Sequence, residues 1–203
     1  MRVTNLITLL SLAGACSSPD AARTTDTTTS APMPEPPDTT RARTVTAQSD
    51  TLKVVRQQHP FSAPGAPDVF TLAVRGTSLL TGEATFTITD ATGQVIFREM
   101  LSSADLEASM VYEMKTPTAT PAKREAFIRR RLDTFFAERN FHKPALGPQE
   151  TYAPGDLDRA TWDDLHQRPE AVSFHYLVGK EDKRRIVWSP LKKQVVRLAS
   201  FGG

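Results

Sequence analysis

The 203-residue sequence predicts an α+β fold, an antiparallel sheet of about six strands with two or three helices packed on it. Strand-like alternation opens and closes residues 51–203, and helical periodicity lies between. Strands and helices do not alternate along the chain, which favours an antiparallel sheet over a parallel one. All ten Phe, both Trp and all three Tyr fall in residues 51–203, so this region can form one core. We therefore expect a single globular domain over residues 51–203.

The first half of the predicted sheet is an N-terminal hairpin region. Residues 69–75 alternate between apolar and polar side chains, as do residues 84–89 and 94–99. The last two strands flank Asp90-Ala91-Thr92-Gly93, where Asp can accept backbone hydrogen bonds and Gly can take a positive φ. This pattern predicts a tight hairpin. Residues 51–58 remain ambiguous between a strand and an irregular lead-in.

The central helix is predicted over residues 121–140. Pro121 suits the first turn, and Thr120 can cap it. Its buried stripe consists of apolar residues at helical spacing: Phe127, Ile128, Leu132, Phe135 and Phe136.

Three consecutive arginines in this helix, Arg129 to Arg131, allow two interpretations. They can bind anionic lipid headgroups or a phosphate, or they can form a solvated helix face. Glu125, Asp133 and Glu138 are close enough in sequence to balance such a face. The second interpretation is favoured, because charged helix faces are usually solvated.

Two shorter helices flank this one. Ser102 or Ser103 can cap a helix that begins at residue 104, and Asp156 can cap one over residues 157–167. A three-strand meander then closes the sheet, with strands over residues 171–178, 184–189 and 194–200. Its first strand directs a set of apolar side chains to one face: Val172, Phe174, Tyr176 and Val178.

The N-terminus predicts export. Arg2 supplies a positive charge, residues 3–12 are mostly apolar, and Ala13-Gly14-Ala15 is a run of small residues before Cys16. These are the three parts of a secretory signal peptide, predicted here over residues 1–15. Cys16 is the only cysteine of the chain, so no intrachain disulfide is expected.

The segment before Cys16 resembles the lipobox of bacterial lipoproteins, although Ala13 stands where that family usually has leucine. The resemblance implies that Cys16 is acylated and becomes the mature N-terminus. Stable anchoring needs more than one acyl chain. Ser17, rather than an aspartate, follows Cys16, which by the same resemblance implies an outer-membrane lipoprotein facing the periplasm.

Residues 16–50 are predicted to be a lipidated cysteine followed by a disordered linker. Beyond Cys16 this segment contains nine Thr, five Pro, four Ser and five Ala, with no aromatic residue. Such a composition cannot bury enough apolar surface to offset the entropy of ordering. We therefore expect a spacer between the membrane and the domain.

Residues 68–200 resemble a group of uncharacterised envelope lipoproteins of Gram-negative bacteria. The resemblance rests on Thr87-Ile88-Thr89-Asp90-Ala91-Thr92-Gly93, on Phe135-Phe136 and on Tyr176-Leu177-Val178-Gly179-Lys180-Glu181-Asp182. It implies a place in the cell envelope and no particular activity.

No catalytic, cofactor-binding or metal-binding motif is recognisable, and the four histidines are widely spaced along the chain. Residues 51–203 carry only three more basic than acidic side chains, too few to predict nucleic-acid binding. We expect a membrane-tethered binding or interaction module, with an envelope protein or a cell-wall ligand as partner. The alternative is an envelope hydrolase whose site assembles from distant residues, such as the histidines His142, His166 and His175.

Overall fold

A computed structural model describes residues 45–46, 48–153, 155 and 157–199, and the structural statements below concern these residues. The predicted signal peptide, Cys16 and most of the predicted linker lie outside them. The described residues all belong to one compact unit, Ala42–Gly203. None of its described helices is long and apolar enough to cross a membrane.

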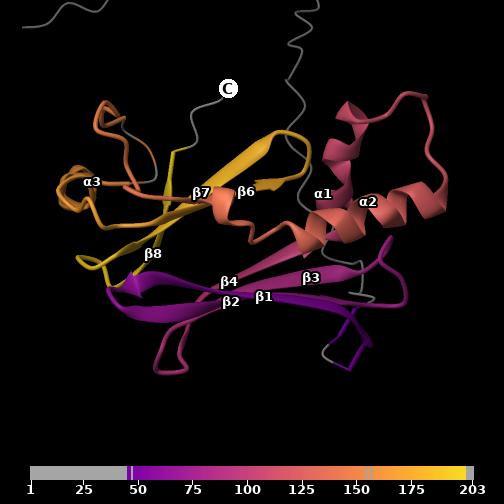
Figure 1. Cartoon of the computed structure of the whole chain (residues 1–203), viewed down its shortest axis with the longest axis horizontal. Coiled ribbons are helices and arrows are strands. Elements are labelled where there is room, and N and C mark those ends of the chain that lie inside the picture. The colour runs from indigo at the N-terminus through magenta and orange to yellow at the C-terminus, as the bar shows by residue number, and fades with distance from the viewer. Residues whose placement is uncertain (1–44, 47, 154, 156, 200–203) are drawn as a thin grey trace, which may run out of the picture. The chain divides into compact units, whose positions relative to one another are not determined.

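Strands open and close the described chain, and helices lie in its middle (Figure 1). The elements in chain order are β1 Thr51–Ala63, β2 Ala66–Arg75, β3 Glu83–Thr89, β4 Val95–Ser102, α1 Ser103–Glu107, η1 Ala108–Tyr112, α2 Pro121–Asp133, η2 Glu138–Asn140, β5 Phe141–His142, α3 Arg159–His166, β6 Ser173–Val178, β7 Asp182–Ser189 and β8 Gln194–Leu198.

The strands form two antiparallel four-stranded sheets, each in sequential order, β1-β2-β3-β4 and β5-β6-β7-β8. The α+β class is confirmed, but the prediction of one sheet of about six strands is wrong. Two strands had no clear pattern in the sequence. The ambiguous N-terminal segment is the 13-residue edge strand β1, where Pro60 is tolerated because β1 pairs only with β2. The other, β5, has only two residues.

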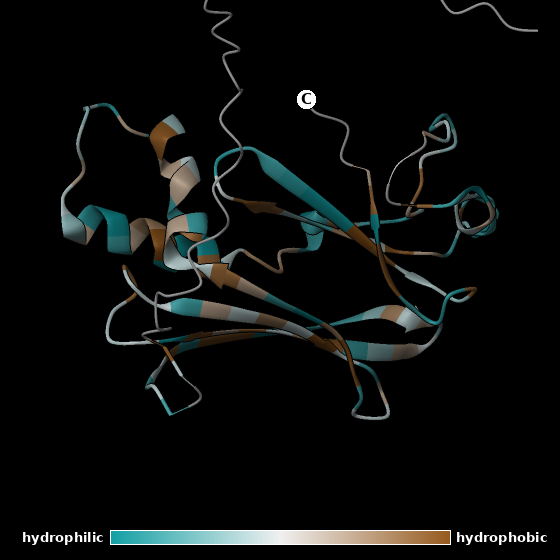
Figure 2. Ribbon diagram, turned by 180° about the vertical axis from the view of Figure 1, so that it is seen from behind, coloured by the Kyte–Doolittle hydropathy of each residue, from teal (hydrophilic) through white to brown (hydrophobic). Residues whose placement is uncertain are grey.

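The two sheets pack face to face through aromatic side chains. Phe70 and Phe86 come from the first sheet, and Phe174 and Tyr176 come from the second. The Phe174 ring centroid lies 5.4 Å from that of Phe70 and 5.6 Å from that of Phe86. Figure 2 shows how apolar and polar positions alternate along these strands. The alternation predicted from the sequence is therefore the one that builds the core.

The second sheet is also partly covered on its other face. Trp162 and Leu165 of α3 belong to a separate apolar cluster with Val187, Val196 and Leu198 of β7 and β8. By contrast, the outer face of the first sheet carries partly exposed side chains such as Thr85 and Met100. Apolar side chains thus pack on both faces of part of the second sheet, whereas the first sheet packs on one face.

The predicted hairpin turn is confirmed. The Asp90 carboxylate accepts hydrogen bonds from the Thr92 hydroxyl at 2.7 Å and from the backbone N–H groups of Thr92 and Gln94, both at 2.9 Å. These bonds, the hydroxyl bond above all, lower the Asp90 pKa. Gly93 has a φ of 89°, which a residue with a side chain rarely adopts. The turn joins β3 to β4 as the sequence indicates.

The helix caps are partly as predicted. Ser102 caps α1 in a capping box with Asp105, and Thr120 caps α2 with Pro121 at its start. The third helix starts later than expected, because Asp158 accepts the Thr161 N–H at 2.9 Å and serves as its cap. The predicted cap, Asp156, lies outside the described residues.

Helix α2 ends at Asp133 and not at residue 140. The Asn140 side-chain amide donates to the carbonyl of Phe135 at 2.8 Å and thereby satisfies a group beyond the helix end. Phe135 and Phe136 consequently lie in a turn after the helix, where both are buried in the core between the sheets.

Candidate functional site

A pocket of about 490 Å³ lies along one edge of β6. Strand β5 pairs only with Ser173 and Phe174, so the remainder of this β6 edge has no neighbouring strand in the described chain. The end of α2 and the segment after it face this edge and form the opposite wall. The residues lining the pocket are Arg131, Thr134, Phe135, Arg139, Asn140, Glu150, His175, Tyr176, Leu177, Lys183, Arg184 and Arg185.

The charge of the lining is strongly one-sided. Glu150 is the only acidic residue in it, whereas five basic residues take part: Arg131, Arg139, Lys183, Arg184 and Arg185. The whole domain is nearly neutral by comparison. Cationic side chains gathered in a concavity favour an anionic ligand, because the low-dielectric walls focus their field.

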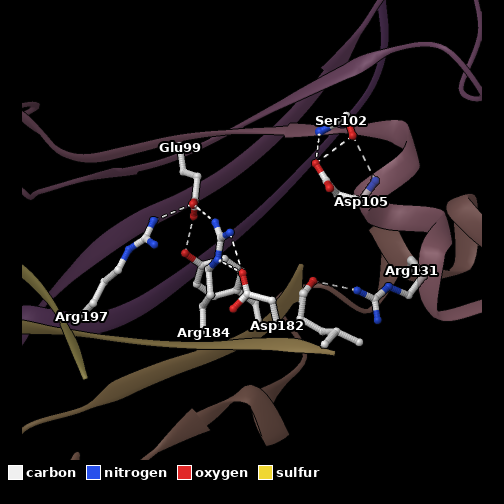
Figure 3. Close-up of polar contacts among 9 residues, drawn as sticks. Glu99, Ser102, Asp105, Arg131, Asp182, Arg184 and Arg197 are labelled. Carbon is white, nitrogen blue, oxygen red and sulfur yellow. Dashed lines mark hydrogen bonds and ion pairs between the residues drawn. The ribbon is translucent and has the colours of Figure 1, made fainter. Parts of the chain in front are cut away.

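Arg131 lies in the last turn of α2 and reaches the open edge of β6. Its Nη2 donates to the Leu177 carbonyl at 3.0 Å, and Figure 3 shows the guanidinium directed at that strand. Its Nε is buried and has no hydrogen-bond partner among the described residues. Burial lowers the pKa of the Arg131 guanidinium, and the charge of Glu113 partly opposes that shift.

The two arginines before it behave differently. Arg129 pairs with Glu125 at 2.8 Å, and Arg130 pairs with Glu113 at 2.5 Å; all four side chains are well exposed. The interpretation of a solvated helix face therefore describes Arg129 and Arg130. It fails for Arg131, which makes no ion pair within the described chain.

Arg185 of β7 already holds a carboxylate. Its Nη2 and Nη1 donate to the two Glu150 oxygens at 3.0 and 3.1 Å, and the Gly147 N–H also donates to Glu150 at 2.9 Å. Burial raises the Glu150 pKa, but the bonds from Arg185 and Gly147 outweigh it, so the pKa is lowered. Arg185 is thereby neutralised inside the pocket, although its buried Nε has no partner in the described residues.

Arg184 is likewise neutralised, by Glu99 of β4. Arg184 and Tyr176 both donate to the Glu99 carboxylate, and Arg197 of β8 donates to it at 2.7 Å (Figure 3). Asp182 contacts Arg184 as well, at 2.7 Å. Burial, followed by the bond to Glu99, raises the Tyr176 pKa. The Glu99 cluster, defined as Glu99, Tyr176, Arg184 and Arg197, thus joins the two sheets.

His175 is the histidine of the pocket. Its Nε2 lies 2.9 Å from the Ser173 hydroxyl, and its ring stacks on His142 with centroids 3.9 Å apart. Burial lowers the His175 pKa to about 4, with further lowering from the charges of His142 and Arg185, whereas Glu150 acts in the opposite direction. His175 is therefore neutral near pH 7, and the positive charge of the pocket comes from arginine and lysine.

The other histidines are dispersed. His59 stacks on Phe141, which packs against the core, and His166 ends α3. Within the described ranges, no three His, Cys, Asp or Glu side chains lie where they could hold a metal ion. The structure thus brings His142 and His175 together and leaves His166 apart.

Sequence reasoning singled out Arg131 but missed Arg139, Glu150 and the basic residues of β7. The run Lys183-Arg184-Arg185 was a usable signal, because consecutive basic residues in a strand place positive charge on both faces. The partners of these residues could not be inferred, since they lie far away in the sequence.

Comparisons of the chain with protein-family models, with curated proteins and with solved structures find no match.

Proposed function

We propose that this chain is a cell-envelope lipoprotein whose folded domain is a binding module. In this proposal Cys16 carries the lipid anchor, residues 17–50 form the spacer, and the domain faces the periplasm from the outer membrane. The signal-like residues before Cys16 and the composition of the spacer support the tether. The ligand is a soluble or cell-wall molecule, or a segment of an envelope protein, with an anionic group.

The observation that carries the binding function is the basic pocket. Its volume of about 490 Å³ lies in the range of small-molecule sites. Two of its arginines are neutralised by Glu99 and Glu150, whereas Arg131 and Arg139 form no ion pair within the described residues. The positive charges of Arg131 and Arg139 are therefore available to bind a ligand.

The alternative function, an envelope hydrolase, has one observation in its favour, the contact between Ser173 and His175. The remaining geometry is unsuited to hydrolysis. The Ser173 side chain is completely buried within a strand, so its hydroxyl cannot reach a substrate carbonyl. The nearby Glu150 carboxylate is bound by Arg185 and does not orient the imidazole. Binding is therefore better supported than hydrolysis.

Metabolic labelling tests the tether. Cells producing the wild type and the Cys16→Ala variant are fed a clickable fatty-acid analogue, and the protein is then examined for label. We expect label on the wild type only, with the variant released from the membrane fraction. Equal labelling of both proteins would contradict the anchor at Cys16.

Calorimetric titration tests the binding module. The full-length protein in a non-ionic detergent is titrated with small anions of different chemistry, including carboxylates, sulfate and phosphates. Saturable binding that weakens with rising salt concentration is expected, because the contacts are ionic. The absence of binding by every anion would refute the binding function at this pocket.

A further inference from the structure

We infer that the basic pocket binds the phosphate group of a small phosphomonoester, held between Arg131 and Arg139. This inference rests on the binding function proposed above and specifies the ligand of the same site. It follows from the distribution of charge, the arrangement of donors and the size of the pocket.

The charges in the pocket leave room for a dianion. Glu99 and Glu150 already neutralise Arg184 and Arg185, respectively. Arg131 has only the neutral Leu177 carbonyl as acceptor, and Arg139 makes no hydrogen bond or ion pair in the described part of the chain. Two guanidinium groups on one wall are thus available to a group that carries two negative charges.

The donors are arranged for an anion with more than two oxygens. Arg131 belongs to α2 and Arg139 to η2, so they approach the pocket from different positions. A carboxylate has two coplanar oxygens and is satisfied by one guanidinium, as Glu150 is by Arg185. A phosphate monoester has three terminal oxygens in a tetrahedral arrangement and can accept from several donors at once.

The unpartnered Nε of Arg131 points to a ligand as well. A buried N–H without an acceptor is destabilising, and native structures rarely leave one in that state. Nη2 meanwhile donates to the Leu177 carbonyl at 3.0 Å, which keeps the Arg131 side chain beside the pocket that it lines. A phosphate oxygen beside Arg131 would supply the missing acceptor after a small turn of the guanidinium toward the pocket.

The pocket is larger than a phosphate group requires. Its floor includes Phe135 and Tyr176, and the neutral imidazole of His175 lies on a neighbouring wall. The aromatic rings can pack against an organic group, and the His175 imidazole can offer it a hydrogen bond. We therefore expect a phosphomonoester to bind more tightly than inorganic phosphate.

Calorimetric titration of the full-length protein in non-ionic detergent tests the ligand class. The probes are inorganic phosphate, glucose 6-phosphate, glutarate, and detergent micelles with and without added phosphatidic acid. We expect glucose 6-phosphate to bind at least about ten-fold more tightly than glutarate, since two guanidinium groups can engage it. Preferential binding to micelles that contain phosphatidic acid would instead identify a lipid as the source of the phosphate group.

Variants locate the site. Arg131→Gln and Arg139→Gln should each weaken glucose 6-phosphate binding about ten-fold or more, the usual cost of a lost charge-assisted hydrogen bond. Arg129→Gln is the matched control, because Arg129 lies on the same helix but pairs with Glu125. It should change the affinity less than about two-fold. Thermal melts followed by circular dichroism check that each variant is folded. If Arg131→Gln does not fold, the affinity of Arg139→Gln for glucose 6-phosphate tests the site.

Nuclear magnetic resonance provides an independent readout. A phosphate bound between Arg131 and Arg139 adds negative charge to the pocket that His175 also lines, so it should raise the pKa of the His175 imidazole. Glutarate binding without phosphomonoester binding would overturn the phosphate assignment and leave the binding function intact. Binding of none of the anions tested would overturn both, and equal loss in Arg129→Gln and Arg131→Gln would overturn the assigned site.

Discussion

The Glu99 cluster and the basic pocket share Arg184 and Tyr176 but differ in whether all of their arginines are paired with a carboxylate. In the cluster, one nearly buried carboxylate receives two guanidinium groups and a tyrosine hydroxyl. In the pocket, Arg131 and Arg139 have no carboxylate partner among the described residues. The difference separates cations that hold the two sheets together from cations that are available to bind a ligand.

Whether an arginine is paired depends on whether the facing chain segment supplies a carboxylate. Glu99 comes from β4 of the first sheet, whereas Arg184 and Arg197 come from β7 and β8 of the second. Their ion pairs therefore add to the packing between the sheets. Arg131 reaches an open strand edge and Arg139 lines the same pocket, and no described carboxylate from the other sheet pairs with either. The predictions below alter one side of this comparison at a time.

Removing the central carboxylate should have the largest effect. Glu99→Gln leaves Arg184 without its main partner between the sheets, and breaking a buried ion pair is strongly destabilising. We expect the free energy of unfolding to fall by about 2–4 kcal/mol in urea denaturation. Glu125→Gln, which breaks an exposed pair, serves as control and should cost less than about 1 kcal/mol. A similar loss in both variants would contradict the structural role of Glu99.

The next largest effect is expected when Arg185 loses its carboxylate partner and becomes available to a ligand. Glu150→Gln removes the charge that Arg185 holds, so the pocket becomes more positive. We expect a loss of stability of about 1–3 kcal/mol from the weakened pair. Glucose 6-phosphate should then bind about three- to ten-fold more tightly, since one repulsive charge has gone. Unchanged or weaker affinity would show that Glu150 takes no part in setting the charge of the site.

Acidification should affect the pocket through His175, which faces His142, Arg185 and Glu150. The folded protein holds this imidazole neutral down to about pH 4, whereas the unfolded chain protonates it near its ordinary pKa. Its contribution to stability is therefore fully present above about pH 6.5 and is lost as the pH falls toward about 4.

The size of this effect is modest because the site is only half-buried. We expect about 1–2 kcal/mol between about pH 7 and about pH 4.5, after allowing for solvent screening. Urea melts of the wild type and His175→Gln at both pH values measure it. The wild type should lose more stability on acidification than the variant. An equal loss in both would show that His175 does not cause the pH dependence of stability.

The smallest effect is expected at the exposed arginines. Arg130→Gln breaks the pair with Glu113, in which both side chains are more than half exposed, 56% and 61%. Such pairs contribute little, so urea denaturation should show a change below about 0.5 kcal/mol. A larger loss would show that the Arg130–Glu113 pair contributes substantially to stability.

Local features of the fold could be predicted from the sequence because they depend on neighbouring residues. The turn at Asp90 and the caps at Ser102 and Thr120 use side chains within a few positions of the groups they bind. The division into two sheets was not predictable in this way, because alternation assigns faces to a strand and does not identify the strand beside it.

The candidate site illustrates the same limit. Asp133 and Glu138 were expected to balance the arginines of the helix, but they pair with Lys53 and His59 of β1. Because the sequence did not clearly predict β1 as a strand, the ion pairs of its residues could not be predicted. The local run of arginines therefore did not show which of them would lack an acidic partner within the described chain.

The contact between Arg131 and the Leu177 carbonyl also bears on solubility. An unpaired strand edge can recruit an edge from another molecule and begin aggregation. Here a positively charged side chain occupies an acceptor on the open edge of β6, where an incoming strand would have to form its hydrogen bonds. One guanidinium on a helix thereby protects a sheet from self-association without an additional strand to cover it.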